Sequence, residues 1–391
     1  MCEVIIIKKL KLFSLILFPL ALILNFIGSK FPDLIDKYYS CFINKFTVQV
    51  LSKISSFFPF SLYEVTMYLI VFSILLFIIH IIINTFKNSI YSYRKRYGSR
   101  RHFFISVAKN YILNILSILS IAYFLFIVLW GLNYNRVPLQ TTLINNYNLS
   151  FNKNISSVKY NAKDLAKLYN FLINKANETR KSVLENNKGV MKANSDYKGI
   201  IDRAKLGYDN IDNILPQTVG NYANPKYVLS SNLMCYTGIT GIYFPFTGEA
   251  NVNVAIPDIY IPSTVIHEMA HQRGFASEDE ANFLGYLASI NHPDIDFNYS
   301  GYILALNHTA NALYKADYDT YVTLTKTMSD DVRRDLINNN QFWDKYEGKV
   351  DEISNQFNDS YLKANGVKEG TASYGKMVDL LLTYYKLYPE K

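Results

Sequence analysis

The sequence predicts a mainly helical protein in which N-terminal membrane-spanning helices precede a mostly helical domain with a small β-sheet. Three observations support this fold class. Long apolar runs are crowded into the first third of the chain, and the later part alternates apolar and polar residues with helical periodicity. Between these helical stretches, a short glycine-punctuated segment at 236–256 has the composition of β-strands.

Composition limits the class of protein further. The 391 residues carry a formal net charge of +8, and half of them are hydrophobic. Much of the basic excess lies in residues 87–109, between two apolar runs, and no nucleic-acid-binding signature accompanies it. We therefore expect a lipid bilayer as partner and no nucleic acid. Cys2, Cys41 and Cys235 are too few and too scattered for a disulfide framework.

Three apolar segments, at about residues 10–27, 66–83 and 111–131, are long enough to cross about 30 Å of hydrocarbon. The first contains Pro19 and Asn25 and follows several lysines, a layout that also fits a secretory signal peptide. No small-x-small cleavage site follows it, so we expect an uncleaved anchor.

The loops between these segments predict the orientation. Residues 87–109 contain seven lysines and arginines and no acidic residue, and short basic loops of this kind stay in the cytoplasm. The N-terminus is then also inside. The sequence thus predicts a multi-pass protein of the cytoplasmic membrane, with a three-span anchor at 1–132 and an extracytoplasmic domain at 133–391.

Within the second part, residues 141–157 are rich in Asn, Ser and Thr and are expected to form a linker or surface loop. Residues 157–187 have apolar residues at helical spacing. Residues 251–256 alternate polar and apolar side chains, which predicts a half-buried or edge strand. This strand could pair with an extended peptide or be a plain sheet strand.

A helix is expected to begin at Pro262-Ser263, with Ser263 or Thr264 as its cap, and to end at Gly274. The rest of the chain is expected to be helical, with interruptions at 292–293, 338–340 and 366–370.

The helix that begins at Pro262 contains the strongest chemical signal. His267 and His271 are four residues apart and therefore project from one face, where both imidazoles can bind one Zn²⁺. Glu268 is placed to take a proton from a water molecule that attacks a carbonyl group. The H-E-x-x-H pattern thus predicts a zinc site with Glu268 as general base.

The third metal ligand is expected in the acidic segment that opens the next helix. Ser277 and Glu280 fit a capping box, which assigns Glu280 a structural role and leaves Glu278 to reach the metal. Glu280 remains the alternative ligand. Asn282 is one turn beyond Glu278 and could orient a ligand histidine from outside.

Residues elsewhere in the chain are weaker candidates. His308 and Tyr374 could stabilise an oxyanion, or could be ordinary buried or surface residues. His292 precedes a proline in a loop and receives no role.

Several motifs spread over nearly the whole chain are informative together. They are Gly131-Leu-Asn-Tyr134 with Arg136 and Pro138, Met234-Cys-Tyr-Thr-Gly-Ile239, Phe244-Pro-Phe-Thr-Gly-Glu249, His267-Glu-Met-Ala-His-Gln-Arg-Gly274, Glu278-Asp-Glu-Ala-Asn-Phe283, Tyr361-Leu-Lys-Ala-Asn-Gly366 and Ser373-Tyr-Gly375. This set resembles an uncharacterised bacterial family of membrane proteins, a domain of unknown function with a presumed zinc-peptidase signature. The H-E-x-x-H and later Glu-x-x-x-Asn pattern is also similar to that of gluzincins, and this implies a zincin-like domain.

The resemblance implies His267, His271 and Glu278 as zinc ligands, Glu268 as base and Asn282 as support. The gap from His271 to Glu278 is shorter than in many gluzincins, so the choice between Glu278 and Glu280 stays open. The predicted function is hydrolysis of a peptide bond in a peptide or protein substrate. The alternatives are a zinc amidase that acts on cell-wall peptides, and a non-catalytic assembly or sensor protein with a structural zinc.

Overall fold

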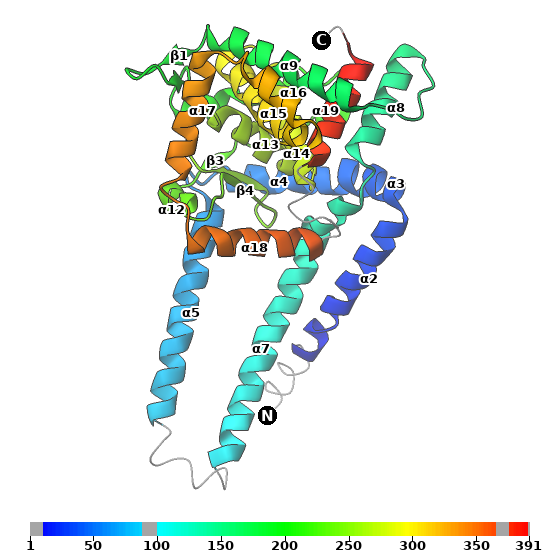
Figure 1. Cartoon of the computed structure of the whole chain (residues 1–391). Helices are drawn as coiled ribbons and strands as arrows, with labels where there is room; N and C mark the ends of the chain where they lie inside the picture. The colour runs from blue at the N-terminus through cyan, green and yellow to red at the C-terminus, as the bar shows by residue number, and fades with distance from the viewer. Residues whose placement is uncertain (1–10, 88–99, 365–374, 390–391) are drawn as a thin grey trace.

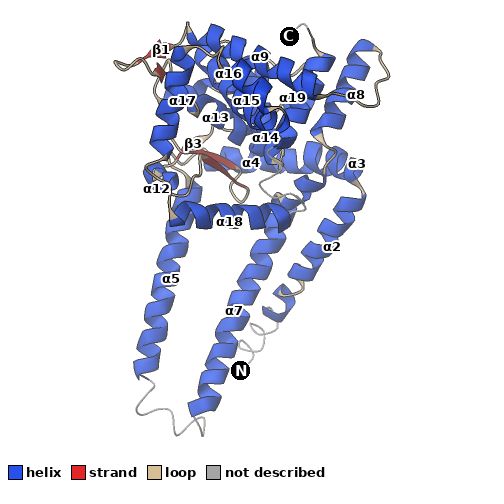
Figure 2. Cartoon of the chain, in the orientation of Figure 1, coloured by secondary structure: helices blue, strands red, loops and turns tan. Residues whose placement is uncertain are grey.

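Three long apolar helices extend from one side of a helical body (Figure 1). The computed structural model describes residues 11–87, 100–364 and 375–389. Helices make up most of this part of the chain, and the strands are few and short (Figure 2). The predicted mainly helical fold with a small sheet is therefore confirmed.

The long apolar helices are α2 (Leu17–Lys30), α5 (Leu62–Lys87) and α7 (Arg100–Leu129). The segments long and apolar enough to span a membrane are Lys11–Lys30, Leu62–Ile83 and Tyr111–Leu129. The first and the last predicted segments agree with these bounds to within a few residues at each end. The second segment, predicted at 66–83, begins four residues too late. The basic loop at 87–109 falls largely outside the residues whose side chains are described.

The late start of the second predicted segment has a physical cause. Glu64 interrupts the apolar run in the sequence, yet its side chain is buried in the structure. The carboxylate accepts hydrogen bonds from the backbone N–H of Leu229 and of Ser230, and from the hydroxyl groups of Ser230 and Tyr68. Because these donors satisfy the charge, the helix includes Glu64 and is joined to the body at its first turn.

A second carboxylate joins the same helix to the sheet. Glu249 accepts hydrogen bonds from the N–H groups of Leu62 and Tyr63, which are free of helical partners in the first turn of α5. Lys226 lies 2.5 Å from the same carboxylate. The span and the sheet are thus fixed relative to each other.

The chain between the first two apolar helices lies across their ends rather than forming a loose loop (Figure 1). It consists of α3 (Pro32–Leu34), the π-helix η1 (Ile35–Asn44) and α4 (Lys45–Ser55). After α7, the 3-10 helix η2 (Gly131–Asn135) packs against η1.

The body is built from helices that follow η2. They are α8 (Leu139–Phe151), α9 (Ala162–Arg180), α10 (Tyr197–Arg203), α11 (Lys205–Asp209), η3 (Pro216–Thr218), α12 (Ser231–Cys235), α13 (Ile261–Gln272), α14 (Glu278–Ile290), α15 (Ile295–Ala316), α16 (Tyr318–Thr325), α17 (Asp330–Trp343), α18 (Lys349–Ala364) and α19 (Lys376–Leu387).

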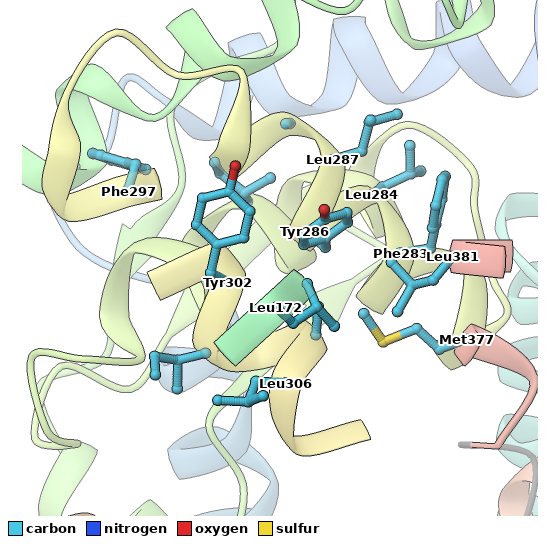
Figure 3. Close-up of a cluster of buried hydrophobic side chains, with 14 of the residues drawn as sticks. Leu172, Phe283, Leu284, Tyr286, Leu287, Phe297, Tyr302, Leu306, Met377 and Leu381 are labelled. Carbon is cyan, nitrogen blue, oxygen red and sulfur yellow. The ribbon is translucent and has the colours of Figure 1, made fainter. Parts of the chain in front are cut away.

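The core lies where α9, α14, α15 and α19 meet (Figure 3). Each helix contributes one apolar face to it, as the periodicity of residues 157–187 predicted for α9. The cluster includes Leu172, Phe283, Leu284, Tyr286, Leu287, Phe297, Leu306, Met377 and Leu381, all essentially inaccessible to solvent.

Two predictions for this region were wrong. The expected linker at 141–157 forms α8 over most of its length, because Leu143 and Ile144 are buried against the body and outweigh the poor helix propensity of the asparagines. The expected interruption at 338–340 lies inside α17, which is fixed to the body by the buried residues Val332 and Asp335. The break at 292–293 is confirmed, whereas 366–370 lies outside the described residues.

Two small sheets complete the body. A hairpin pairs β1 (Leu184–Glu185) with β2 (Met191–Lys192). A three-stranded sheet has the order β3 (Lys226–Tyr227), β5 (Glu249–Val252) and β4 (Gly241–Phe244), with β5 parallel to β3 and antiparallel to β4.

The prediction of a half-buried or edge strand at 251–256 was wrong, because β5 covers Glu249–Val252, is the central strand and is buried on both sides. Asn251 and Asn253, which suggested a solvent-facing side, are completely buried. Their amides are satisfied inside the protein: Asn251 donates to the carbonyl of Ile242 and Asn253 to that of Ile239. The edge strand next to the helix that carries His267 and His271 is β4.

A buried ion pair holds α9 to α17 and gives a stability prediction. Arg180 Nε lies 2.6 Å from Asp335 Oδ2, and Asp335 is fully buried. Arg180→Met leaves this carboxylate without its cation, so we expect a loss of about 3–5 kcal/mol in the free energy of unfolding. The matched control on the same helix is Lys175→Met, which breaks only the exposed pair with Glu178 and is expected to cost under about 1 kcal/mol.

Chemical denaturation of the full-length chain in detergent measures both variants. Equal, small losses for the two substitutions would contradict the prediction.

Candidate metal centre

Helix α13 carries both histidines of the predicted site. It begins after Tyr260, and Pro262 occupies the first turn, where its missing N–H costs nothing. The expected caps were wrong, because Ser263 and Thr264 lie inside the helix and the cap residue Tyr260 makes no side-chain cap hydrogen bond. His267 and His271 project from one face, as their spacing requires.

A sharp reversal after α13 brings the next acidic segment back to this face. Gly274 has φ +82°, a conformation that favours glycine, and α14 begins four residues later. A Cβ at Gly274 would also press on Asn133 and Asn44. The carbonyl of Gly274 accepts a hydrogen bond from Arg136, which is paired with Asp36. The reversal is therefore fixed by residues of η1 and by residues in and directly after η2.

The reversal places Glu278 beside the two histidines. His267 Nε2 lies 3.1 Å from His271 Nε2 and 3.3 Å from Glu278 Oε2, and His271 Nε2 lies 3.6 Å from Glu278 Oε1. Ligand atoms about 2.05 Å from a tetrahedral zinc ion are about 3.3 Å from one another. The distances between the two ring nitrogens and from each of them to the nearer oxygen of Glu278 are thus close to those that one metal ion requires, and one ligand atom from each of the three residues lies within 4.8 Å of the other two.

The second ring nitrogen of His271 is held by the reversal. Nδ1 lies 2.7 Å from the carbonyl oxygen of Phe275 and donates its proton there, so Nε2 is the nitrogen that faces Glu278 and that can bind a proton or a metal ion. Burial acts to lower the pKa of His271, but the Glu278 carboxylate outweighs it and raises this pKa to about 9. Burial acts to raise the pKa of Glu278, yet His271 and His267 hold it well below its usual range. When a metal cation binds at this site, its positive charge can stabilise the Glu278 carboxylate in place of the proton on His271.

Glu268 points to the other side of the histidines, against strand β4. Its Oε1 lies 4.0 Å from His267 Nε2, and a Cβ at Gly241 would collide with this carboxylate. Gly241 is therefore needed for the close approach of β4. Glu268 Oε2 is buried and has no hydrogen-bond partner among the described residues. Burial raises the pKa of Glu268 to about 7, although the two histidines oppose this rise.

Glu280, the alternative third ligand, lies elsewhere. Its Oε1 accepts a hydrogen bond of 2.6 Å from the N–H of Leu139 at the start of α8, and burial raises its pKa. The predicted capping box was wrong, since Ser277 makes no side-chain cap hydrogen bond in α14. Among the described residues, only Glu278 completes a cluster with His267 and His271.

A cavity of about 340 Å³ opens beside the cluster. His267 and Glu278 line it together with Asn282, so Asn282 faces the cavity, and no described hydrogen bond joins it to a histidine. Trp343 of α17 and Thr240, which directly precedes β4, also line the cavity. His308 lies on α15 and is not among the lining residues, whereas Tyr374 falls outside the described residues.

Three aromatic residues next to the cluster were not predicted from the sequence. The ring of Trp130, at the end of α7, stands edge-on to His271 with centroids 5.7 Å apart. Tyr361 on α18 accepts hydrogen bonds from Trp130 Nε1 and from the Tyr134 hydroxyl. Tyr134 and Tyr361 both interact electrostatically with Glu278. Tyr134 and Tyr361 lie in motifs that carry the family resemblance. Their place in these motifs was the sequence feature that could have marked them as site residues.

The fold and the cluster together define a mainly helical protein with three helices apolar enough to span a membrane and a His-His-Glu cluster where the helical body meets them. The chain belongs to the family described as "Protein of unknown function (DUF3810)", whose model matches residues 39–382. No curated protein and no solved structure matches the chain.

Proposed function

We propose that this protein is a membrane-anchored zinc metallopeptidase with a zincin-like site. The observation that carries the proposal is the triangle formed by His267, His271 and Glu278, with the buried carboxylate of Glu268 beside it. Two imidazoles and one carboxylate are a ligand set typical of catalytic zinc. Structural zinc sites are closed by four protein ligands, and the cluster within the described residues has three.

Each residue then has a defined task. A zinc ion held here would supply Lewis-acid activation of a water molecule and of the scissile carbonyl. Glu268 accepts the proton of the attacking water and passes it to the leaving amine. Glu268 Oε2 has no hydrogen-bond partner among the described residues, so it can accept this proton. A pKa of about 7 allows the same carboxyl group to release the proton again at neutral pH.

Aromatic hydroxyl groups supply the second part of the mechanism. Burial raises the pKa of Tyr134 and of Tyr361, and both hydroxyls stay protonated at neutral pH. Tyr134 donates its proton to Tyr361, and the Tyr361 hydroxyl can in turn donate a hydrogen bond to an oxyanion. The edge strand β4, which contacts Glu268 through Gly241, is the strand that can pair with an extended peptide.

The membrane arrangement is part of the proposal. The apolar helices α2, α5 and α7 cross the cytoplasmic membrane, and the basic segment at 87–109 keeps the far ends of α5 and α7 in the cytoplasm. The helical body, with the metal centre, then lies outside.

Metal removal tests the proposal on the full-length chain in detergent. We expect about one zinc per chain and hydrolysis of a fluorogenic peptide mixture or of cell-wall peptides. A chelator should abolish hydrolysis, and added zinc should restore it, because the metal and its three ligands form one unit. Hydrolysis of cell-wall peptides alone would favour the amidase alternative. Failure to bind zinc at neutral pH would exclude the proposed function.

A further inference from the structure

Helix α18 (Lys349–Ala364) lies across the ends of the apolar helices, below the sheet and beside the metal centre (Figure 1). Near its C-terminal end, Tyr361 contacts the outer end of α7 through Trp130 and Phe126. Near its start, Asp351 approaches Gly238, just beyond α12, and α12 is joined to the first turn of α5 through Glu64 and Ser230. The helix therefore bridges the region between α5 and α7.

The side chains of α18 are arranged unlike those of an ordinary helix on the surface of a soluble body. Leu362 is buried and Asp351 and Asn358 are half-buried against the body. The apolar residues at helical spacing are turned away from it: Val350, Ile353 and Phe357 are 55%, 53% and 74% exposed. An amphipathic helix normally buries its apolar stripe against its own protein.

A second segment of the same molecule has the same pattern. The η1–α4 segment directly connects α2 to α5, so it must run along the membrane surface if these helices span the bilayer. Its residues Phe42, Phe46 and Ile54 follow one side of the helices and are 72%, 68% and 53% exposed. Exposed apolar stripes thus occur on both elements that lie across the ends of the spans.

We propose that the stripe Val350–Ile353–Phe357 of α18 inserts into the outer leaflet of the bilayer, so that α18 is an interfacial helix beneath the metal centre. Helix α18 lies at the level of the body end of α5 (Figure 1), and the most apolar stretch of α5 has no buried residue. Lys349 and Lys363 at the ends of α18 are exposed and can reach lipid phosphates while the apolar side is immersed. This inference rests on the membrane arrangement proposed above but not on the metal chemistry, so loss of zinc binding would leave it intact.

Depth measurements on the full-length chain test the inference. Single cysteines are introduced as Phe357→Cys, Ile353→Cys and Asn355→Cys in a chain with Cys2→Ser and Cys41→Ser, where the remaining Cys235 is buried. Each is labelled with a fluorophore in nanodiscs that hold one chain and lipids with nitroxides on their acyl chains. Ile79→Cys on α5 gives the reference for lipid, and the strongly exposed Leu149→Cys on α8 gives the reference for water.

We expect nitroxide lipids to quench the labels at positions 357 and 353 nearly as strongly as the label at position 79, and several-fold more strongly than the label at position 149. The matched control at position 355, on the side of the helix opposite to positions 353 and 357, should be quenched less. Quenching at 357 and 353 by iodide instead of lipid would overturn the inference, because the stripe would then face water. Protection from both quenchers would also overturn it, because a protein segment would then cover the stripe.

Discussion

Glu268→Gln is expected to reduce peptide hydrolysis by roughly 10²- to 10⁴-fold, the range that general acid–base catalysis contributes. Glutamine has nearly the same shape as glutamate but cannot accept the proton of the attacking water. Because Glu268 stands beside the histidines rather than closing their triangle with Glu278, the bound zinc should remain at the wild-type level.

Two measurements on the same preparation separate these effects. Metal analysis of the full-length variant reports the zinc content, and hydrolysis of the fluorogenic peptide mixture reports the rate. Unchanged hydrolysis with zinc retained would show that Glu268 is not the base. Loss of zinc would instead place Glu268 among the ligands, contrary to the arrangement proposed here.

Glu278→Ala is expected to abolish stable zinc binding, because it removes one of the three donor atoms that lie within 4.8 Å of one another. The loss of affinity should exceed the 10–100-fold that the removal of an outer-shell partner typically costs. The control is Glu280→Gln, which keeps a side-chain oxygen to accept the hydrogen bond from the N–H of Leu139. This variant should bind zinc as the wild type does.

Competition with a chromophoric zinc chelator measures both affinities. Retained binding in Glu278→Ala together with loss in Glu280→Gln would assign the third ligand to Glu280. Thermal unfolding of the zinc-free chains checks that neither substitution simply unfolds the protein, since both side chains are partly buried.

Local patterns in the sequence were sufficient for part of this architecture. The apolar segments were recognised from length and composition, because crossing a bilayer imposes a minimum length that few other structures require. The positions of His267 and His271 on one face also follow from the sequence, because the helical period alone determines which residues share a face. The break before α15 follows from Pro293, which cannot continue a helix.

Other features depended on contacts between distant segments. The sequence alone could not separate Glu278 from Glu280, because both lie in the same helical turn. The structure separates them, since the reversal at Gly274, held by Arg136, directs Glu278 to the histidines while Leu139 binds Glu280.

The same limit explains the wrong edge strand and the aromatic residues that were missed. Buried asparagines in β5 have the polar pattern of exposed residues, and only their partners in β4 and in the loop after α12 reveal that they are inside. Trp130 and Tyr361 are 231 positions apart and meet beside His271 only in the folded chain. Helical period and apolar length are local properties that the sequence determines by itself, whereas the satisfaction of buried polar groups is decided by tertiary structure.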